Sequence, residues 1–243
     1  MTDQAPESPL VLREDSDGVA TLTLNRPDKR NALSISMLET LQGALSAVAD
    51  DKSIRAVVIA ANGPAFCSGH DLKEIRANPG CQNYDALFTL CSDVMRAITH
   101  LPQPVIARVH ALATAAGCQL VASCDLAVAA KSAWFATPGV HIGLFCSTPM
   151  VPLSRNIGRK QAMQMLVTGD RIDAETAERW GLINQAVEDD LLDKAVAELT
   201  AKITSKSPLT LKIGKEAFYR QLEMDIDTAY AYVTETMTVN LMS

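Results

Sequence analysis

The sequence predicts an α/β fold in which a core of strands and helices is followed by a helical C-terminal part of the same domain. Apolar runs of strand length alternate with amphipathic stretches through the first two thirds of the 243 residues, and the last third is mostly helical in pattern. The chain contains neither an internal repeat nor a Gly/Ser-rich linker. We therefore expect one domain over 1–243, with the core at about 10–190 and the helical region at about 191–243.

The strands of the core are predicted first. Residues 18–25 alternate in hydrophobicity with a period of two, which is typical of a strand. Residues 54–61 and 104–113 are continuous apolar runs, which indicate strands covered on both faces. Two further strands are expected in "DLAVAA" and "WFATP", after which the strands stop.

Helices are predicted between and after these strands. From Ser34, apolar residues recur on one helical face as far as Val48, and the pair Ser36 and Glu39 has the spacing of a capping box. A second helix is expected through about 84–99. The later helices are expected at about 160–167, 174–180, 191–203, 209–219 and 226 to the end.

Composition and charge exclude several classes of partner. The net charge is −6, and the basic residues are scattered, so we expect no nucleic-acid partner and no anionic membrane surface. No apolar run reaches membrane-spanning length without interruption. The first ten residues, "MTDQAPESPL", lack the features of a secretory signal or a transit peptide, which predicts a cytoplasmic protein.

The six cysteines are interpreted as reduced core residues. They form no CxxC pair, and most of them lie in apolar stretches, so neither a zinc site nor a disulfide framework is expected. We expect no metal and no separate cofactor.

Two loops join a predicted strand to a following helix, "GPAFCSGHDLKEI" at 63–75 and "ALATAAGCQL" at 111–120. Ligands of α/β sheets bind at the carboxyl ends of strands, and small residues there let backbone N–H groups approach a ligand. Two converging N–H groups would make an oxyanion hole. Close packing of the loops is the alternative explanation of the small residues.

These segments resemble the crotonase superfamily, the enoyl-CoA hydratases and isomerases. The two loops are similar to its two oxyanion segments, and "NRPDKRNALS", "FATPGVHIGL" and "TGDRIDAETAERWGLINQAV" follow in the family's order. "SGHDLKE" and "GLFCSTP" are most similar to the subgroup called enoyl-CoA hydratase domain-containing protein 3. The resemblance implies a spiral of strand–strand–helix turns with a helical C-terminal trimerisation region.

The resemblance also implies a site. An acyl-CoA thioester would place its carbonyl between the backbone N–H groups of Ser68 and Ala116, and coenzyme A would enter only as part of the substrate. Arg30 or Lys29 would meet a phosphate, the alternative being a solvated loop charge. The residues implied in substrate and coenzyme A binding are Arg30, Ala32, Leu33, Ala65, Gly69, His70, Asp71, Leu72 and Gly117.

The chain departs from the family where hydratases carry two glutamates, because Gln119 and Gly139 stand there. An amide orients a water molecule but takes no proton from it at neutral pH. Substitutes for the missing acids are His70, which can also cap the loop, His141, if the chain stays extended there, and Ser147, whose alternative role is a helix N-cap. Restoring both glutamates should raise hydratase activity, provided that the side chain fits at Gly139.

Three functions remain open. The first is a lyase of the enoyl-CoA hydratase type, acting in fatty acid metabolism, with weak hydratase activity. The second is a crotonase-fold enzyme of other chemistry, a decarboxylase or a thioesterase. The third is a non-catalytic acyl-CoA binder. A homotrimer or a dimer of trimers is expected, because the apolar face of one C-terminal helix needs a partner surface: Leu192, Val196, Leu199 and Ile203.

Overall fold

Two sheets form the core of the computed structural model, which describes residues 8–242. The larger sheet has six strands in the order β1-β2-β3-β4-β6-β9, parallel except for the β1–β2 pair, and the smaller has the order β5-β7-β8. The strands are β1 (Val11–Ser16), β2 (Val19–Leu24), β3 (Ala56–Ala61), β4 (Val105–Val109), β5 (Ala113–Thr114), β6 (Leu126–Ala130), β7 (Trp134–Ala136), β8 (Ile172–Asp173) and β9 (Gln185–Val187).

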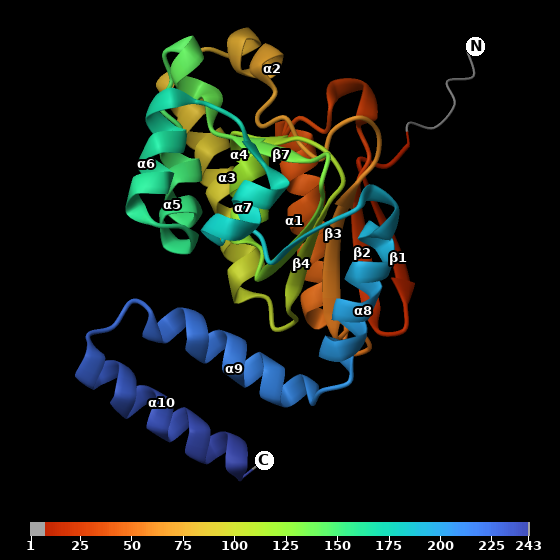
Figure 1. Cartoon of the computed structure of the whole chain (residues 1–243), viewed down its shortest axis with the longest axis vertical. Helices are drawn as coiled ribbons and strands as arrows, with labels where there is room; N and C mark the ends of the chain where they lie inside the picture. Colours follow the sequence, from red (N-terminus) through yellow and green to blue (C-terminus); the bar gives the residue numbers. More distant parts are fainter. Residues whose placement is uncertain (1–7, 243) are drawn as a thin grey trace.

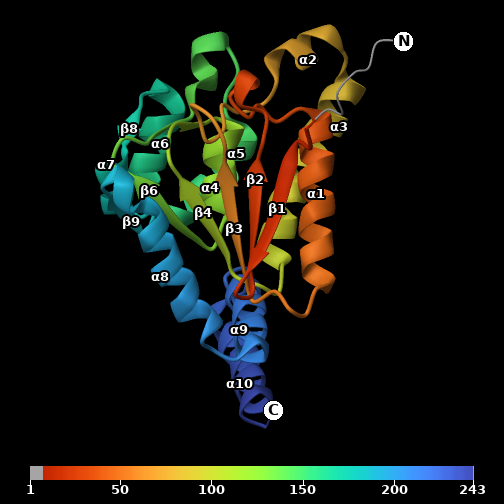
Figure 2. The ribbon, with the colours of Figure 1, turned by 90° about the vertical axis from the view of Figure 1, so that its right-hand side faces the viewer.

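Helices cover both faces of the larger sheet (Figures 1 and 2). The α-helices are α1 (Ile35–Asp50), α2 (Leu72–Ala77), α3 (Cys81–His100), α4 (Ala116–Ser123), α5 (Ser147–Asn156), α6 (Arg159–Thr168), α7 (Ala174–Trp180), α8 (Leu192–Thr204), α9 (Pro208–Gln221) and α10 (Ile226–Leu241). Three short 3₁₀ helices are η1 (Pro27–Lys29), η2 (Pro138–Ile142) and η3 (Asp189–Leu191). The predicted α/β class is confirmed.

Strand β3 shows why the two faces have separate cores. Val57 and Ile59 belong to the main apolar cluster, which includes residues of α1 and α3, whereas Ala56 and Val58 belong to a second cluster with residues of α8. Side chains alternate along a strand, so a strand covered on both faces must be apolar throughout. All six residues of β3 are buried, as the continuous apolar run predicted.

Several predicted boundaries need correction. The N-cap of α1 is Ser34, whose hydroxyl accepts a hydrogen bond from the N–H of Met37 at 3.1 Å, so Ser36 and Glu39 form no capping box. The run 104–113 divides into β4 and β5, because the chain leaves the larger sheet at His110 and joins the smaller one at Ala113. The sequence analysis also missed β1, β8, β9, α2 and α5, and strands do not stop after β7.

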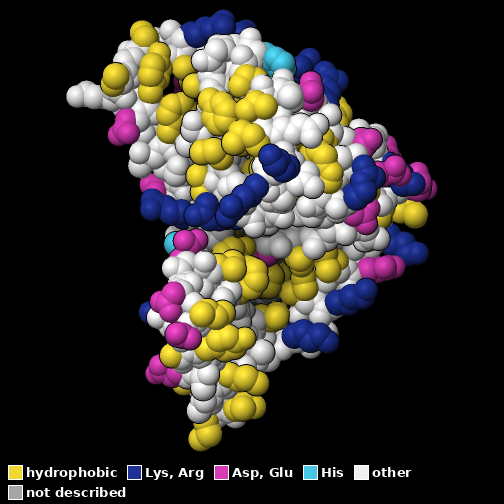
Figure 3. All heavy atoms as spheres, turned by 60° about the vertical axis from the view of Figure 1, so that its left-hand side comes forward, with side chains coloured by type: hydrophobic (Ala, Val, Ile, Leu, Met, Phe, Trp, Pro, Cys, Tyr) yellow, Lys and Arg dark blue, Asp and Glu magenta, His cyan; other side chains and the backbone are white. Residues whose placement is uncertain are grey.

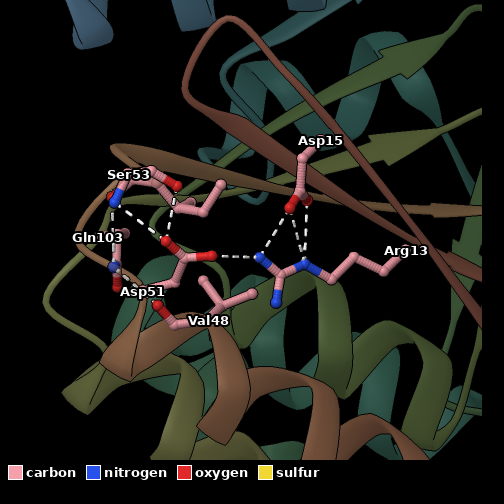
Figure 4. Close-up of polar contacts among 7 residues, drawn as sticks. Arg13, Asp15, Val48, Asp51, Ser53 and Gln103 are labelled. Atoms are coloured by element: carbon pink, nitrogen blue, oxygen red, sulfur yellow. Dashed lines mark hydrogen bonds and ion pairs between the residues drawn. The ribbon is translucent and has the colours of Figure 1, made fainter.

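Polar side chains close the end of the larger sheet remote from the two loops (Figure 4). Arg13 on β1 donates to Asp15 and, at 2.7 Å, to Asp51 at the end of α1. The Gln103 amide donates to the Val48 carbonyl at 3.0 Å, which fixes the connection between α3 and β4. This network joins three elements that are distant in the sequence.

The apolar face of α8 has its partner within the same chain. Leu192 and Val196 are buried against the outer face of the sheet, and Leu199 and Ile203 are packed against the same cluster. The sequence-based reason for assembly was therefore wrong for this helix, because β3, β4 and β6 supply the partner surface.

Helices α9 and α10 form a hairpin that projects from the core (Figures 1 and 2). A buried cluster anchors it: Lys215 Nζ lies 2.6 Å from Asp125 Oδ2, and the Tyr219 hydroxyl donates to Asp125 Oδ1 at 2.8 Å. Apolar side chains are nevertheless exposed along the hairpin, and Figure 3 shows hydrophobic surface in its lower part. The large apolar side chains exposed on the hairpin include Phe218, Leu222, Ile226, Tyr230 and Met237. This surface, unlike that of α8, is uncovered in the single chain.

Candidate functional site

The two loops singled out in the sequence lie against each other. The N–H of Phe66 donates to the Leu112 carbonyl at 3.0 Å, and the N–H of Thr114 donates to the Cys67 carbonyl at 2.9 Å. Isolated β-bridges join Cys67 to Ala113 and Leu33 to His70. The loops after β3 and β4 are thus held in register by backbone hydrogen bonds, at the carboxyl ends of adjacent parallel strands.

Two glycines make this approach possible. A Cβ atom on Gly117 would lie 2.2 Å from the Cys67 carbonyl oxygen. Gly69 has a φ of +92°, and a Cβ atom there would lie 2.9 Å from the Ala115 Cβ and 3.4 Å from the Ala116 nitrogen. Both glycines therefore serve close packing, the alternative considered from the sequence, and Gly69 touches the backbone at the start of α4.

Backbone strain is stored at the same point. Ala115, the N-cap residue of α4, has a φ of +50° and a ψ of −118°, which is costly for a residue with a Cβ atom. Its own N–H donates to the Ala136 carbonyl at 2.9 Å. No acceptor among residues 8–242 takes the next N–H, that of Ala116, which is the first residue of the helix. The strained turn directs this donor, and the positive end of the helix dipole, towards Gly69 in the first loop.

In the first loop, the backbone N–H that the resemblance implied as a donor is already paired, and another is free. The N–H of Ser68 is already used, because it donates to the Arg30 carbonyl at 3.1 Å. In the bridge to Leu33, the carbonyl of Gly69 and the N–H of Asp71 face Leu33, so the backbone groups of His70 face the other way. The described part of the chain offers no acceptor to the His70 N–H. The N–H groups of His70 and Ala116 are therefore both without an acceptor, and the two residues lie on either side of Gly69.

The side chain of His70 is largely buried. Its Nδ1 lies 3.4 Å from the Leu33 carbonyl oxygen, and its ring packs edge-on against Phe88 with 5.5 Å between centroids. Its Nε2 is buried and has no hydrogen-bond partner within residues 8–242. Burial lowers the pKa of the imidazole below 6.5, although the Leu33 carbonyl acts in the opposite direction.

Gln119 lies one turn after Ala116 on α4 and is only 3% exposed. Its Oε1 is 4.0 Å from Cys91 Sγ on α3. Burial raises the pKa of the Cys91 thiol to about 12, so the thiol is protonated and acts as a weak donor to the amide. No described side chain or carbonyl accepts from the amide nitrogen of Gln119.

The position of the second family glutamate, Gly139, has no space for a side chain. Gly139 is buried in η2, where a Cβ atom would lie 2.1 Å from the Leu144 carbonyl oxygen and 2.8 Å from Cys146 Sγ. Our condition that a glutamate side chain fit at this position is not met, because η2 folds the chain back onto the glycine.

His141 and Ser147 are not brought into the site. His141 is exposed on η2, and its imidazole lies beside Gly169, where an added Cβ atom would be 2.7 Å from Nε2. The segment is a 3₁₀ helix, so the alternation that would turn His141 inward does not apply. Ser147 is exposed as the first residue of α5, and the N-cap is Cys146, which corrects the predicted capping role.

The residues implied in coenzyme A binding have mixed environments. Ala32, Leu33 and Ala65 are buried, whereas Arg30 and Leu72 are exposed at the rim of the loops. Lys29 forms an exposed ion pair with Asp28 at 3.3 Å. Arg30, Ala32 and Leu33 belong to the loop from 26 to 34, which is joined by backbone hydrogen bonds to the loop from 62 to 71.

Asp71 has a structural role. Its carboxylate caps α2 by accepting from the N–H groups of Lys73 and Glu74, and it pairs with Arg26 at 3.0 Å. Although burial acts to raise it, the pKa of Asp71 is lowered by the backbone N–H of Glu74 and by Arg26.

Asn31 is a residue that the sequence analysis missed. It is fully buried with a φ of +52°, and its amide donates to the carbonyls of Asn62 and Ala65, both at 2.8 Å. Asn31 therefore ties the loop at 26–34 to the loop after β3. The available signal was the residue type, because asparagine tolerates left-handed backbone and bonds backbone groups with its side chain.

Other features of the described residues lie apart from these loops. A groove of about 530 Å³ lies between α8 and the outer face of β2 and β3, opposite α1 and α3.

Among residues 8–242, no three His, Cys, Asp or Glu side chains are grouped to hold a metal ion, and no helix has the length and hydrophobicity to span a membrane. Five cysteines are buried and unpaired, but Cys81 is exposed.

The family model described as enoyl-CoA hydratase/isomerase matches residues 14–243. The mitochondrial enoyl-CoA hydratase domain-containing protein 3 of Rattus norvegicus is 44% identical over 97% of this chain and 79% of its own length. The short-chain-enoyl-CoA hydratase of Clostridium acetobutylicum is 33% identical over 93% of this chain and 87% of its own.

Comparison with solved structures gives the same family as the sequence comparisons. An enoyl-CoA hydratase of Mycobacterium smegmatis superposes with a TM-score of 0.96 at 54% identity, covering 97% of this chain and 92% of that one. Human enoyl-CoA hydratase domain-containing protein 3 gives 0.94 at 44% identity, with 96% and 92% coverage.

The expected cytoplasmic location is contradicted by these comparisons, because the relatives from rat, mouse and human are all named as mitochondrial. The N-terminal stretch on which that expectation depended lies largely in residues 1–7, outside the described residues. The resemblance to the crotonase superfamily and to its subgroup is confirmed: the chain belongs to the enoyl-CoA hydratase/isomerase family.

Proposed function

We propose that the protein binds an acyl-CoA thioester and receives its carbonyl oxygen between the N–H groups of His70 and Ala116. The observation that carries this proposal is that these two donors are unpaired on either side of Gly69, whereas that of Ser68 is already used. Donors fixed in advance stabilise the negative charge of an enolate, and losing one typically costs an enzyme about 100-fold to 1,000-fold in rate. Arg30 and Leu72, exposed at the rim, are available to the coenzyme A moiety.

Hydration of a conjugated enoyl thioester is expected to be slow. The position of one family glutamate holds the neutral Gln119, and the backbone around Gly139 excludes a side chain. A lost general acid or base removes about 100-fold to 10,000-fold in rate. The absence of both glutamates also favours a second candidate, a crotonase-fold decarboxylase or thioesterase, in which enolate or oxyanion stabilisation matters more than a carboxylate pair.

We also propose that the α9–α10 hairpin joins copies of the chain into a trimer or a dimer of trimers. The exposed apolar side chains of the hairpin support this, since burying them contributes about 25 cal/mol for each Å². Light scattering should give a mass of three or six chains, and a stable monomer would contradict the proposal.

The proposed function is tested by binding and turnover together. Calorimetry with butyryl-CoA should show binding, and crotonyl-CoA should be hydrated below the range of about 1 to 1,000 per second that is usual for enzymes. Mass spectrometry of products from a panel of acyl-CoA thioesters would identify decarboxylation or thioester hydrolysis.

A proline variant tests the second donor. Ala116→Pro removes the N–H at the first position of α4, where a helix accepts proline, and should weaken binding at least tenfold. Arg159→Pro, at the first position of α6, is the matched control and should bind normally. Equal binding by both variants would exclude Ala116 as a donor.

A further inference from the structure

The imidazole side chain of His70 has no role in the proposed binding of the thioester carbonyl. Only its backbone N–H takes part there, yet its Nε2 is buried without a partner within residues 8–242. A buried polar atom left unpaired destabilises the folded protein, so a structure that retains one has either strain or a ligand to explain it.

The ring has a defined chemical character. Nδ1 lies 3.4 Å from the Leu33 carbonyl oxygen, a contact that favours the tautomer with the proton on Nδ1. Nε2 then has a free lone pair and lies on the side of the ring away from Leu33. Burial, which lowers the pKa of this imidazole, favours the neutral form in which this lone pair is available.

His70 and Gln119 contact the same face of α3. The His70 ring packs on Phe88, and the Gln119 amide lies beside Cys91, one turn further along the helix. The backbones of the two residues are also near each other, because a Cβ atom on Gly69 would lie 3.4 Å from the Ala116 nitrogen and Gln119 follows Ala116 by one turn. An acceptor, His70 Nε2, and a donor, the Gln119 amide nitrogen, therefore belong to two side chains that pack on α3 next to the two unpaired N–H groups in the sequence.

We infer that His70 Nε2 and the Gln119 amide hold an oxygen at the β-carbon of the acyl chain, and that His70 moves the proton of this oxygen. The oxygen is a water molecule beside an enoyl thioester or the hydroxyl group of a 3-hydroxyacyl thioester. The inference rests on the proposed function, since it requires the thioester carbonyl to be bound by the N–H groups of His70 and Ala116.

The step balances with one base. Water gives a proton to His70 Nε2 while its oxygen forms a bond to the β-carbon. The electron pair of the Cα=Cβ double bond forms the double bond between the α-carbon and the carbonyl carbon, and the π pair of the carbonyl moves to its oxygen, where the two N–H groups stabilise the enolate. Protonated His70 then returns the proton to the α-carbon, and the thioester carbonyl re-forms. Gln119 takes no proton and keeps the water oriented.

Two substitutions separate binding from proton transfer, because every residue except proline keeps the backbone N–H at position 70. His70→Phe replaces the ring by one of similar size that has no acceptor. It should bind butyryl-CoA like the unmodified protein, bind 3-hydroxybutyryl-CoA about tenfold more weakly, and hydrate crotonyl-CoA at least about 100-fold more slowly. His70→Asn keeps a polar group and should lose hydration while retaining part of the preference for the hydroxyl group.

His100→Phe is the matched control, since His100 is exposed at the end of α3 and should change none of these values. If the unmodified protein binds neither thioester, the proposed function fails and the inference fails with it. If both thioesters bind but neither His70 variant alters hydroxyl preference or hydration, the inference alone is wrong. Normal butyryl-CoA binding by either variant shows that its loss of hydration is not caused by misfolding.

Discussion

The loops that surround Ala116 and the α9–α10 hairpin are stabilised in opposite ways. The loops are fixed from within the chain by backbone hydrogen bonds, by the buried Asn31 amide and by two glycines whose side-chain positions are filled by neighbours. The hairpin is anchored through the Lys215–Asp125–Tyr219 cluster and an exposed ion pair between Arg155 and Glu223, and much of its apolar surface is uncovered. The groups of the candidate site are therefore held in place by contacts within one chain, whereas the hairpin retains exposed apolar surface that a second chain can cover.

Breaking the anchor of the hairpin should have the largest effect. Lys215→Met leaves Asp125, which is 14% exposed, without its charged partner, and should lower the free energy of unfolding by about 3 kcal/mol. Denaturant titration measures this loss, and limited proteolysis should cut between α8 and α10. Lys131→Met, which breaks exposed ion pairs, is the control and should change the free energy of unfolding far less. Equal losses in the two variants would show that the cluster is no anchor.

Separating the two loops should have the next largest effect. The new Cβ atom in Gly117→Ala would meet the Cys67 carbonyl, and because that atom is backbone the loops must move apart. We expect a loss of about 2 kcal/mol in stability and weaker butyryl-CoA binding. Gly43→Ala in α1, where the added atom meets nothing within 4 Å, should instead stabilise by up to about 1 kcal/mol. Retained stability and binding in Gly117→Ala would mean that the loops are not rigid.

The smallest effect concerns the pH dependence of stability at His70. Burial lowers the pKa of His70 in the folded protein below 6.5, so as pH falls through 6.5 the unfolded chain takes up a proton before the folded one. The unmodified protein should lose this part of its stability in acid, and His70→Phe should not. The Tm of the variant minus that of the unmodified protein should therefore rise from pH 7 to pH 5 and stay constant between pH 7 and pH 8. A difference that is flat throughout would contradict the burial of an uncharged imidazole.

The sequence by itself determined the class of the fold, the main helices and the two loops of the candidate site. These depend on local signals: the period of apolar residues in α1, the continuous apolar run of β3, and small residues next to the ends of strands. Short edge strands such as β9, which has one exposed and two partly buried residues, have no such signal, because the pairing of β9 with β6 is made only in the folded chain.

Tertiary structure decided which groups in those loops are available for chemistry. Whether the N–H of Ser68 or of His70 is free depends on the Arg30 carbonyl, which arrives from another segment, and no spacing in the sequence encodes this contact. Likewise, Leu144 and Cys146 close the space at Gly139, and β3, β4 and β6 cover the apolar face of α8. The local periodicity of the sequence predicts which residues are buried and which are exposed. The partner of each hydrogen-bond donor, acceptor and apolar face is set by contacts between segments that are distant in the sequence.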